Sequence, residues 1–123
     1  MRLKTKTLTL YGLHKCSTCV KARAWLDEHG KPYAFIDYRE EPIAAPQLQK
    51  WSRELGGWEK LVNRASMTWR NLPDSRKAPE SDAQWAELVA EFPALVRRPV
   101  MVEADGSVSV GFSDKKYSEL LGG

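Results

Sequence analysis

Hydrophobic and polar positions follow a strand pattern in two short stretches near the start of the chain. Residues 7–10 alternate threonine and leucine, and residues 33–38 are aromatic and β-branched, both typical of β-strands. Between these stretches the period changes to that of a helix with one apolar face, formed by Cys19, Ala22 and Leu26 with Val20 and Trp25 beside them. Gly30 and Pro32 favour a helix end. The pattern predicts strand, helix and strand over residues 7–38.

The middle of the chain differs from its ends, because residues 42–92 combine helical patterns with four of the seven prolines and four of the five tryptophans. An apolar stripe predicts a helix that begins at Pro46 and ends at Gly56. A short helix is indicated at residues 58–62. Ser81 is a typical helix N-cap, and the helix after it would carry the apolar side chains of Trp85, Leu88, Val89 and Phe92.

The last part of the chain returns to strand patterns. Residues 99–103 and 107–110 flank an Asp105-Gly106 pair, which suits the positive φ angles of a tight hairpin turn. Ser113 can cap a final helix, whose apolar face is predicted to consist of Tyr117, Leu120 and Leu121.

The predicted elements follow the order β-α-β, a helical block, and β-β-α, which is the order of thioredoxin-like folds. We therefore expect an α/β thioredoxin-like fold with a mixed four-stranded sheet and a helical insertion at about residues 42–92. A length of 123 residues is typical of one domain, and no stretch is polar and flexible enough to be a linker. Residues 1–123 are predicted to form a single domain.

Composition and charge argue against several classes of protein. The apolar fraction of 42% is too high for intrinsic disorder. The 19 basic and 16 acidic side chains give a net charge of +3, which does not indicate a dedicated nucleic-acid binder. The chain lacks an apolar run of about 18 residues, and its basic start is not followed by the apolar stretch of a signal peptide. We expect a cytoplasmic protein that binds neither membranes nor nucleic acids directly.

Cys16 and Cys19 form a C-x-x-C pair where the first strand leads through a loop into a helix. This spacing brings the two sulfurs close enough to bridge. The N–H groups of the first helical turn and the helix dipole favour the thiolate of Cys16, and Lys15 and His14 add positive charge. A lower thiol pKa makes the sulfur reactive at neutral pH. We predict that Cys16 is the attacking thiol and that Cys19, deeper in the helix, is the resolving thiol.

Two alternatives to redox chemistry are a zinc site and a pair of inert structural cysteines. Zinc requires about four ligands, and the remaining candidates are His14 and Asp37. Because no second C-x-x-C is present, we predict no metal site. Inert thiols are disfavoured because C-x-x-C in a βαβ pattern is itself a redox signature.

The Arg98-Pro99 pair at the start of a predicted strand is a second candidate. In thioredoxin-like folds a cis-proline loop faces the C-x-x-C, which would bring Arg98 or Arg97 near Cys16 to bind an anion. The alternative is a trans proline on an edge strand beside solvated arginines. Arg64, taken alone, is most simply a solvated side chain, and the tryptophans are most simply core residues.

Several short motifs together resemble the ArsC-like family of glutaredoxin-coupled arsenate reductases and their relatives. The similarity extends from about Thr7 to Leu121 and is carried by Tyr11-Gly12-x-x-x-Cys16, residues 21–26, residues 57–64, Thr68-Trp69-Arg70, Pro93-Ala94-Leu95, Arg98-Pro99 and Val110-Gly111-Phe112. The pieces at residues 57–59, 68–70 and 110–112 look most like the YffB branch, whose members are thought to be glutathione-dependent thiol reductases. Residues 16–26 also look like the Spx-type redox regulators, which bind RNA polymerase.

The resemblance implies roles for particular residues. Cys16 falls at the nucleophile of the arsenate reductases, and Arg64 and Arg98 fall at two of the three arginines that hold the oxyanion there. The third arginine has no counterpart in residues 110–113, and Cys19 stands where those enzymes have a polar residue other than cysteine.

We therefore expect a thiol–disulfide oxidoreductase, glutathione-dependent, that uses Cys16 and Cys19 and binds its substrate through Arg64, Arg98, Pro99 and Lys15. No cofactor would be bound, and glutathione would act as co-substrate. The expected partners are glutathione or a glutaredoxin or thioredoxin, together with a small-molecule or protein disulfide. The alternatives are a glutaredoxin-coupled arsenate reductase and an Spx-like redox regulator that binds RNA polymerase.

Overall fold

The computed structural model describes residues 8–122, which divide into two compact units. The first unit comprises residues 8–37 and 98–122, and the second comprises residues 38–97. The predicted helical insertion at residues 42–92 lies inside the second unit. That the whole chain forms one domain stays a prediction.

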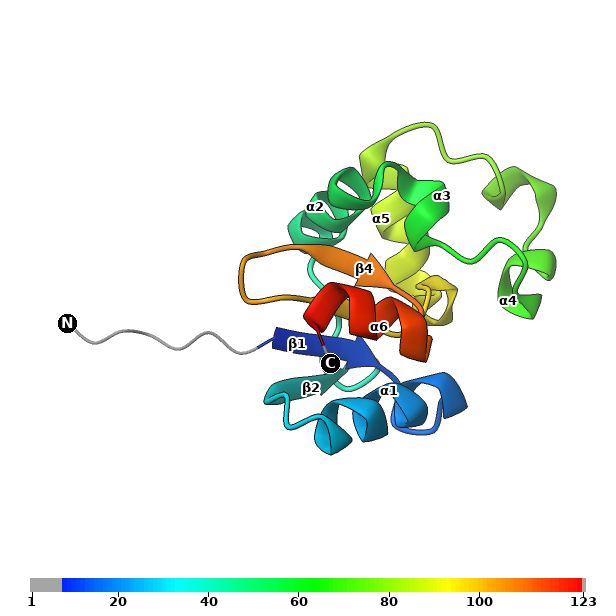
Figure 1. Ribbon diagram of the computed structural model, residues 1–123. Coiled ribbons are helices and arrows are strands. Elements are labelled where there is room, and N and C mark those ends of the chain that lie inside the picture. The colour runs from blue at the N-terminus through cyan, green and yellow to red at the C-terminus, as the bar shows by residue number, and fades with distance from the viewer. Residues whose placement is uncertain (1–7, 123) are drawn as a thin grey trace. The chain divides into compact units, whose positions relative to one another are not determined.

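The first unit is built on a mixed four-stranded sheet with the strand order β2-β1-β3-β4 (Figure 1). Its strands are β1 (Leu8–Gly12), β2 (Tyr33–Asp37), β3 (Val100–Val102) and β4 (Val108–Val110). β1 runs parallel to β2 and antiparallel to β3, and β3 runs antiparallel to β4. This sheet confirms the predicted thioredoxin-like arrangement. The predicted first residue of the first strand, Thr7, lies outside the described residues.

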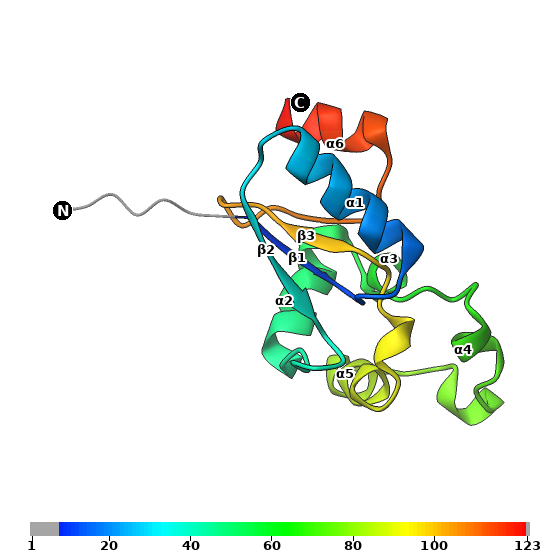
Figure 2. The ribbon, with the colours of Figure 1, turned by 90° about the horizontal axis from the view of Figure 1, so that it is seen from below.

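Helices α1 (Ser17–Glu28) and α6 (Asp114–Leu121) cover the same face of this sheet (Figure 2). They bury a core that consists of Leu8, Leu10, Ala22, Trp25, Leu26, Met101 and Tyr117. The prediction that Val20 and Leu120 belong to the apolar helix faces is wrong, because their side chains are 51% and 41% exposed. Val20 directly follows the buried Cys19, and Leu120 follows the exposed Glu119, so both lie at the solvent side of their helices.

Two local sequence signals lie near the end of the first unit, the Ser113 helix cap and the Asp105-Gly106 turn, and the structure confirms the first but not the turn geometry of the second. The Ser113 hydroxyl accepts a hydrogen bond from the Lys116 N–H at 3.0 Å and caps α6. In the hairpin between β3 and β4, Gly106 has a positive φ of 95°, but Asp105 does not. The hairpin is present, but its turn does not have the two positive φ angles that the Asp-Gly pair predicts. It is closed by the Gly106 N–H, which donates to the Glu103 carbonyl at 2.9 Å, and by the Glu103 N–H, which donates to the Ser107 carbonyl at 2.8 Å.

The second unit is helical. Among its described residues, two helices are longer than four residues, and these are α2 (Ala45–Leu55) and α5 (Asp82–Glu91). The shorter ones are α3 (Trp58–Leu61), α4 (Met67–Arg70), and the 3₁₀ turns η1 (Asp74–Arg76) and η2 (Pro93–Leu95). Sequence patterns predict α2, α3 and α5 closely, including the Ser81 cap of α5. They miss α4, which is capped by Ser66 and buries Trp69 alone, whereas the equally short α3 has two buried side chains at helical spacing, Trp58 and Leu61.

Three tryptophans stack in the second unit and confirm that its aromatic residues are mainly packing residues. The ring of Trp85 lies between those of Trp58 and Trp69, with centroid distances of 5.7 and 6.0 Å. The indole N–H of Trp58 donates to the Asp82 carboxylate at 2.8 Å. Across the described part of the chain, every helix falls short of the length and apolarity that a bilayer crossing demands.

Candidate thiol site

Cys16 occupies the N-cap position of α1, in extended backbone directly before the first helical residue. Its own N–H donates to the Leu13 carbonyl at 3.2 Å, which closes the turn between β1 and α1. Its carbonyl accepts from the Val20 N–H at 2.9 Å and begins the helical ladder. The side chain is half-buried, and the thiol is free. The sulfur is therefore held by a rigid turn at a helix N-terminus and remains accessible.

The surroundings of Cys16 lower the pKa of its thiol. Partial burial alone would raise this pKa, but hydrogen bonds from the Cys19 N–H, the Cys19 thiol, the Arg98 guanidinium and the Thr18 N–H outweigh the burial. Each of these donors stabilises a negative sulfur. The contributing basic side chain is Arg98, whereas Lys15 is exposed in the turn before Cys16.

The surroundings of Cys19 act in the opposite direction. Its side chain is fully buried, and burial raises the pKa of its thiol to about 11. A hydrogen bond from the Leu13 backbone acts against burial and lowers this pKa, the hydrogen bond to the Cys16 sulfur and the charge of a Cys16 thiolate raise it, and the charge of Arg98 lowers it. Cys19 is thus a protonated donor beside a thiolate. Its deeper burial compared with Cys16 agrees with the prediction from the sequence.

Gly12, the last residue of β1, allows the Cys19 sulfur to lie against the strand. A Cβ atom built on Gly12 would lie only 2.5 Å from the Cys19 sulfur, which is shorter than real contacts of this kind. Gly12 is buried and has no positive φ, so the requirement is for space rather than for an unusual backbone. The sequence motif contains Gly12 but does not predict this contact.

The Arg98–Pro99 peptide bond is cis, which confirms the alternative that the thioredoxin-like fold favoured. Of the two adjacent arginines, Arg98 is the one that donates to the Cys16 sulfur. Arg97 belongs to the second unit, where its N–H donates to the Leu61 carbonyl at 2.8 Å. Pro99 is buried, and its carbonyl accepts from the Gly111 N–H at 2.9 Å.

His14 and Asp37, the candidate zinc ligands in the sequence, form a local pair in the first unit. The buried Asp37 carboxylate accepts from the His14 N–H at 2.9 Å, and the same oxygen lies 3.9 Å from His14 Nε2. The His14 ring packs against Phe35 with a centroid distance of 5.1 Å. The prediction that the chain holds no metal stays a prediction.

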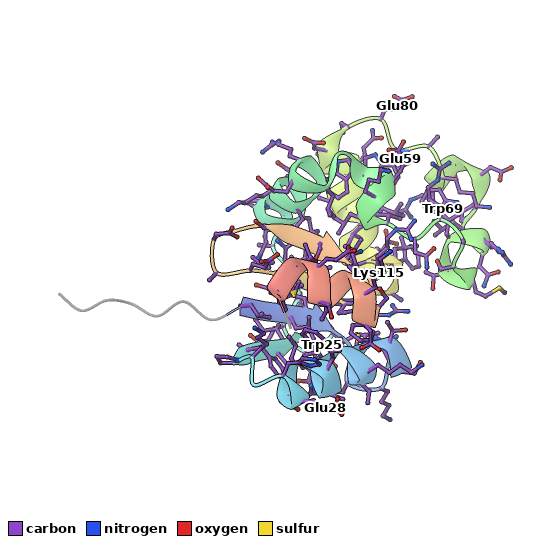
Figure 3. All side chains as sticks on the ribbon, viewed as in Figure 1. Trp25, Glu28, Glu59, Trp69, Glu80 and Lys115 are labelled. Carbon is purple, nitrogen blue, oxygen red and sulfur yellow. The ribbon has the colours of Figure 1, made fainter. Side chains whose placement is uncertain are left out.

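Arg64 lies in the second unit, in the loop before α4. Its guanidinium lies over the Trp69 ring, 5.5 Å from the ring centroid. Trp69, which is labelled in Figure 3, is at one end of the tryptophan stack. The loop is braced by the Asn63 N–H, which donates to the Leu95 carbonyl, and by Ser66 Oγ, which donates to the Asn63 carbonyl. A cation–π contact uses the face of the guanidinium and leaves its N–H edge able to bind an anion. The role of Arg64 at the thiol stays a prediction.

The fold and the cysteine pair define a class: an α/β protein of the thioredoxin-like fold with C-x-x-C at the start of its first helix. The model of the ArsC family matches residues 11–120, so the chain belongs to the ArsC family. This result confirms the resemblance seen in the sequence motifs.

Comparison with known proteins gives relatives of several kinds. The solved structure of a protein named YffB is 40% identical, covers 94% of this chain and 99% of its own, and has a TM-score of 0.84. An arsenate reductase related protein from Brucella melitensis is 37% identical with a TM-score of 0.73, over 96% of this chain and 97% of its own. The global transcriptional regulator Spx of Enterococcus faecalis is 34% identical over 93% of this chain and 86% of its own.

Proposed function

We propose that this protein is a thiol–disulfide oxidoreductase that uses Cys16 as nucleophile, Cys19 as resolving thiol and glutathione as co-substrate. The observation that supports this most strongly is the opposite shift of the two thiol pKa values within one hydrogen-bonded pair. Such a difference separates an attacking thiolate from a reserve thiol. Membership of a family with both reductase-related and regulatory relatives supports thiol chemistry.

The proposed reaction is a pair of thiol–disulfide exchanges. The Cys16 thiolate attacks one sulfur of a substrate disulfide, a new sulfur–sulfur bond forms, and the other sulfur leaves as a thiolate. The Cys19 proton passes to this departing thiolate, and the Cys19 thiolate then attacks the Cys16 sulfur and displaces the second substrate sulfur as a thiolate, which takes its proton from water. The substrate gains two electrons, and Cys16 and Cys19 become a disulfide. Two glutathione thiols restore the dithiol and become glutathione disulfide.

Substrate binding is proposed for Arg98, Pro99, Lys15 and Arg64. Arg98 donates to the Cys16 sulfur, so its planar fork can also hold a carboxylate or an oxyanion that arrives there. Pro99 follows it directly, and Lys15 precedes Cys16, where its exposed charge can attract an anion. Arg64 is included because of its place in the family motif and because Trp69 supports its guanidinium.

Mass spectrometry of the reduced protein, equilibrated in a series of glutathione redox buffers, tests this function. We expect a reversible Cys16–Cys19 disulfide or a Cys16 adduct at cytosolic potentials. The Cys16→Ser variant should form neither species, and Cys19→Ser should accumulate the Cys16 mixed disulfide because the resolving thiol is absent. Wild-type thiols that stay reduced and form no adduct would contradict the proposal.

The relatedness to Spx supports a second candidate, a redox regulator that binds RNA polymerase. A pull-down with the polymerase α subunit, under reducing and oxidising conditions, distinguishes it from the oxidoreductase. Binding that depends on the Cys16–Cys19 disulfide favours the regulator. Turnover of a disulfide substrate without such binding favours the enzyme.

Arsenate reduction is the remaining alternative, and relatedness to an arsenate reductase related protein supports it. Arsenite production with glutathione and glutaredoxin would support this activity. Against it stands the segment Val110–Phe112, which supplies no arginine and whose Phe112 ring packs against Tyr117 at a centroid distance of 4.7 Å.

A further inference from the structure

The carboxyl ends of the two parallel strands bring Gly12 and Asp37 side by side. They are register partners in the β1–β2 ladder, and they are the last residues of their strands. The turn that leads to Cys16 starts directly after Gly12. Both cysteines therefore follow Gly12, a residue that is paired with β2 in the sheet.

Asp37 attaches this turn to β2. Its carboxylate is only 8% exposed and accepts from the His14 N–H at 2.9 Å. His14 lies two residues before Cys16, and the Cys16 N–H in turn donates to the Leu13 carbonyl. A buried carboxylate hydrogen-bonded to a backbone N–H is a strong and directional contact. It fixes the turn that sets where the Cys16 sulfur lies at the end of α1.

Gly12 sets the position of the other sulfur. Because it has no side chain, the fully buried Cys19 sulfur can occupy the space beside the end of β1 that a Cβ atom would fill. The paired residues Gly12 and Asp37 thus act on different thiols. Asp37 acts on Cys16 through a hydrogen bond to the turn before it, and Gly12 acts on Cys19 because it has no side chain.

We propose that Asp37 and Gly12 are positioning residues for the thiol pair: Asp37 fixes the turn that delivers Cys16, and Gly12 provides the space for Cys19. Their importance for turnover rests on the proposed function. Their effect on the two thiols does not, because the reactivity of a thiol can be measured without a substrate.

The test compares Asp37→Ala with Asp37→Asn and with a matched control, Asp105→Ala. Asp105 also accepts a backbone hydrogen bond in the first unit, from the Ser107 N–H at 2.9 Å. It lies in the hairpin after Val102, which pairs with Thr9 near the start of β1, whereas Cys16 follows the other end of that strand. The readouts are the rate of Cys16 alkylation at neutral pH and the equilibrium between the dithiol and its disulfide.

For Asp37→Ala we expect Cys16 alkylation to slow about tenfold, the size of one lost charge-assisted hydrogen bond. Asp37→Asn should stay within about threefold of wild type, because its amide oxygen can accept from the same N–H. His14→Ala should also stay within about threefold, because it keeps the backbone donor. Asp105→Ala should leave both readouts unchanged.

For Gly12→Ala we expect the main change in the disulfide equilibrium rather than in alkylation. The added methyl group displaces the Cys19 sulfur, and disulfide geometry tolerates little displacement, so the equilibrium constant should shift about tenfold. Cys16 alkylation should slow by less than the equilibrium shifts, because the displaced Cys19 thiol weakens only one of the hydrogen bonds that lower the Cys16 pKa and the turn before Cys16 is intact.

Equal effects of Asp37→Ala and Asp105→Ala on both readouts would overturn the role of Asp37. An unchanged disulfide equilibrium in Gly12→Ala would overturn the role of Gly12. If Asp37→Ala does not fold, hydrogen exchange of the His14 amide in wild-type protein decides: slow exchange supports the contact, and exchange at the rate of an unstructured amide refutes it. Wild-type protein that shows normal alkylation but forms no disulfide or adduct would contradict the proposed function alone.

Discussion

The two units hold their candidate arginines in different ways. In the first unit Arg98 donates to the Cys16 sulfur, so its charge acts directly on a reactive atom. In the second unit Arg64 rests on the face of Trp69, at the end of a stack that continues through Trp85 to Trp58. Arg98 lowers the pKa of a reactive thiol, whereas Arg64 packs on aromatic rings that are not reactive.

This difference shows how one short chain divides its tasks. The first unit places sulfur, backbone N–H groups and Arg98 around a helix N-terminus, where small displacements change the pKa of a thiol. The second unit uses large aromatic rings, which bury much surface and tolerate irregular loops between short helices. We therefore expect substitutions in the first unit to alter thiol reactivity and substitutions in the second to alter stability.

The largest expected effect is on the tryptophan stack. Trp69→Ala removes a ring that is 7% exposed and stacked against Trp85, so it should destabilise the protein by about 3–5 kcal/mol. Urea unfolding measures this loss. Cys16 alkylation in the folded variant should match wild type, and a large change in alkylation would break the comparison between the units.

A smaller effect is expected from Arg98→Met, which keeps the length of the side chain and removes its charge and donors. The pKa of Cys16 should rise, because one of the hydrogen bonds that lower it is lost. Alkylation at neutral pH should slow about tenfold, as for one hydrogen bond to a charged group. The matched variant Arg64→Met should leave alkylation unchanged, and an equal slowing in both variants would contradict the assignment.

The smallest effects are expected from the helix caps. Ser81→Ala and Ser113→Ala each remove a hydroxyl that accepts a first-turn N–H, at 3.2 Å from Gln84 and 3.0 Å from Lys116. Each should cost about 1 kcal/mol in urea unfolding. If the chain is one domain, both variants shift a single transition. Two transitions, each moved by only one variant, would show that the units unfold separately.

Local patterns predicted those parts of the structure that depend on neighbouring residues. The strands, α1, the caps at Ser81 and Ser113, and the cis bond before Pro99 follow from periodicity, capping chemistry and fold class. The exposure of Val20 did not follow, because helical spacing does not decide which edge of an apolar face meets solvent.

The contacts that position the thiols were also beyond sequence reasoning. The Asp37–His14 hydrogen bond spans 23 residues, and the closeness of Gly12 to the Cys19 sulfur depends on how α1 packs on β1. In the second unit, tryptophan content predicted burial but not the order of the stack. Such features arise from tertiary packing, and the periodicity of a single sequence does not encode them.

The most direct test of the central claim is the pH dependence of alkylation at each cysteine, followed by peptide mass spectrometry from about pH 5 to about pH 10. Cys16 should react first, with a midpoint below the ordinary thiol pKa, and its reactivity should fall only as the pH drops through that lowered value. Cys19 should stay unreactive across this range, because its pKa is raised to about 11. Two cysteines that react together, with a shared midpoint at the ordinary value, would contradict the assignment of Cys16 as nucleophile and Cys19 as resolving thiol.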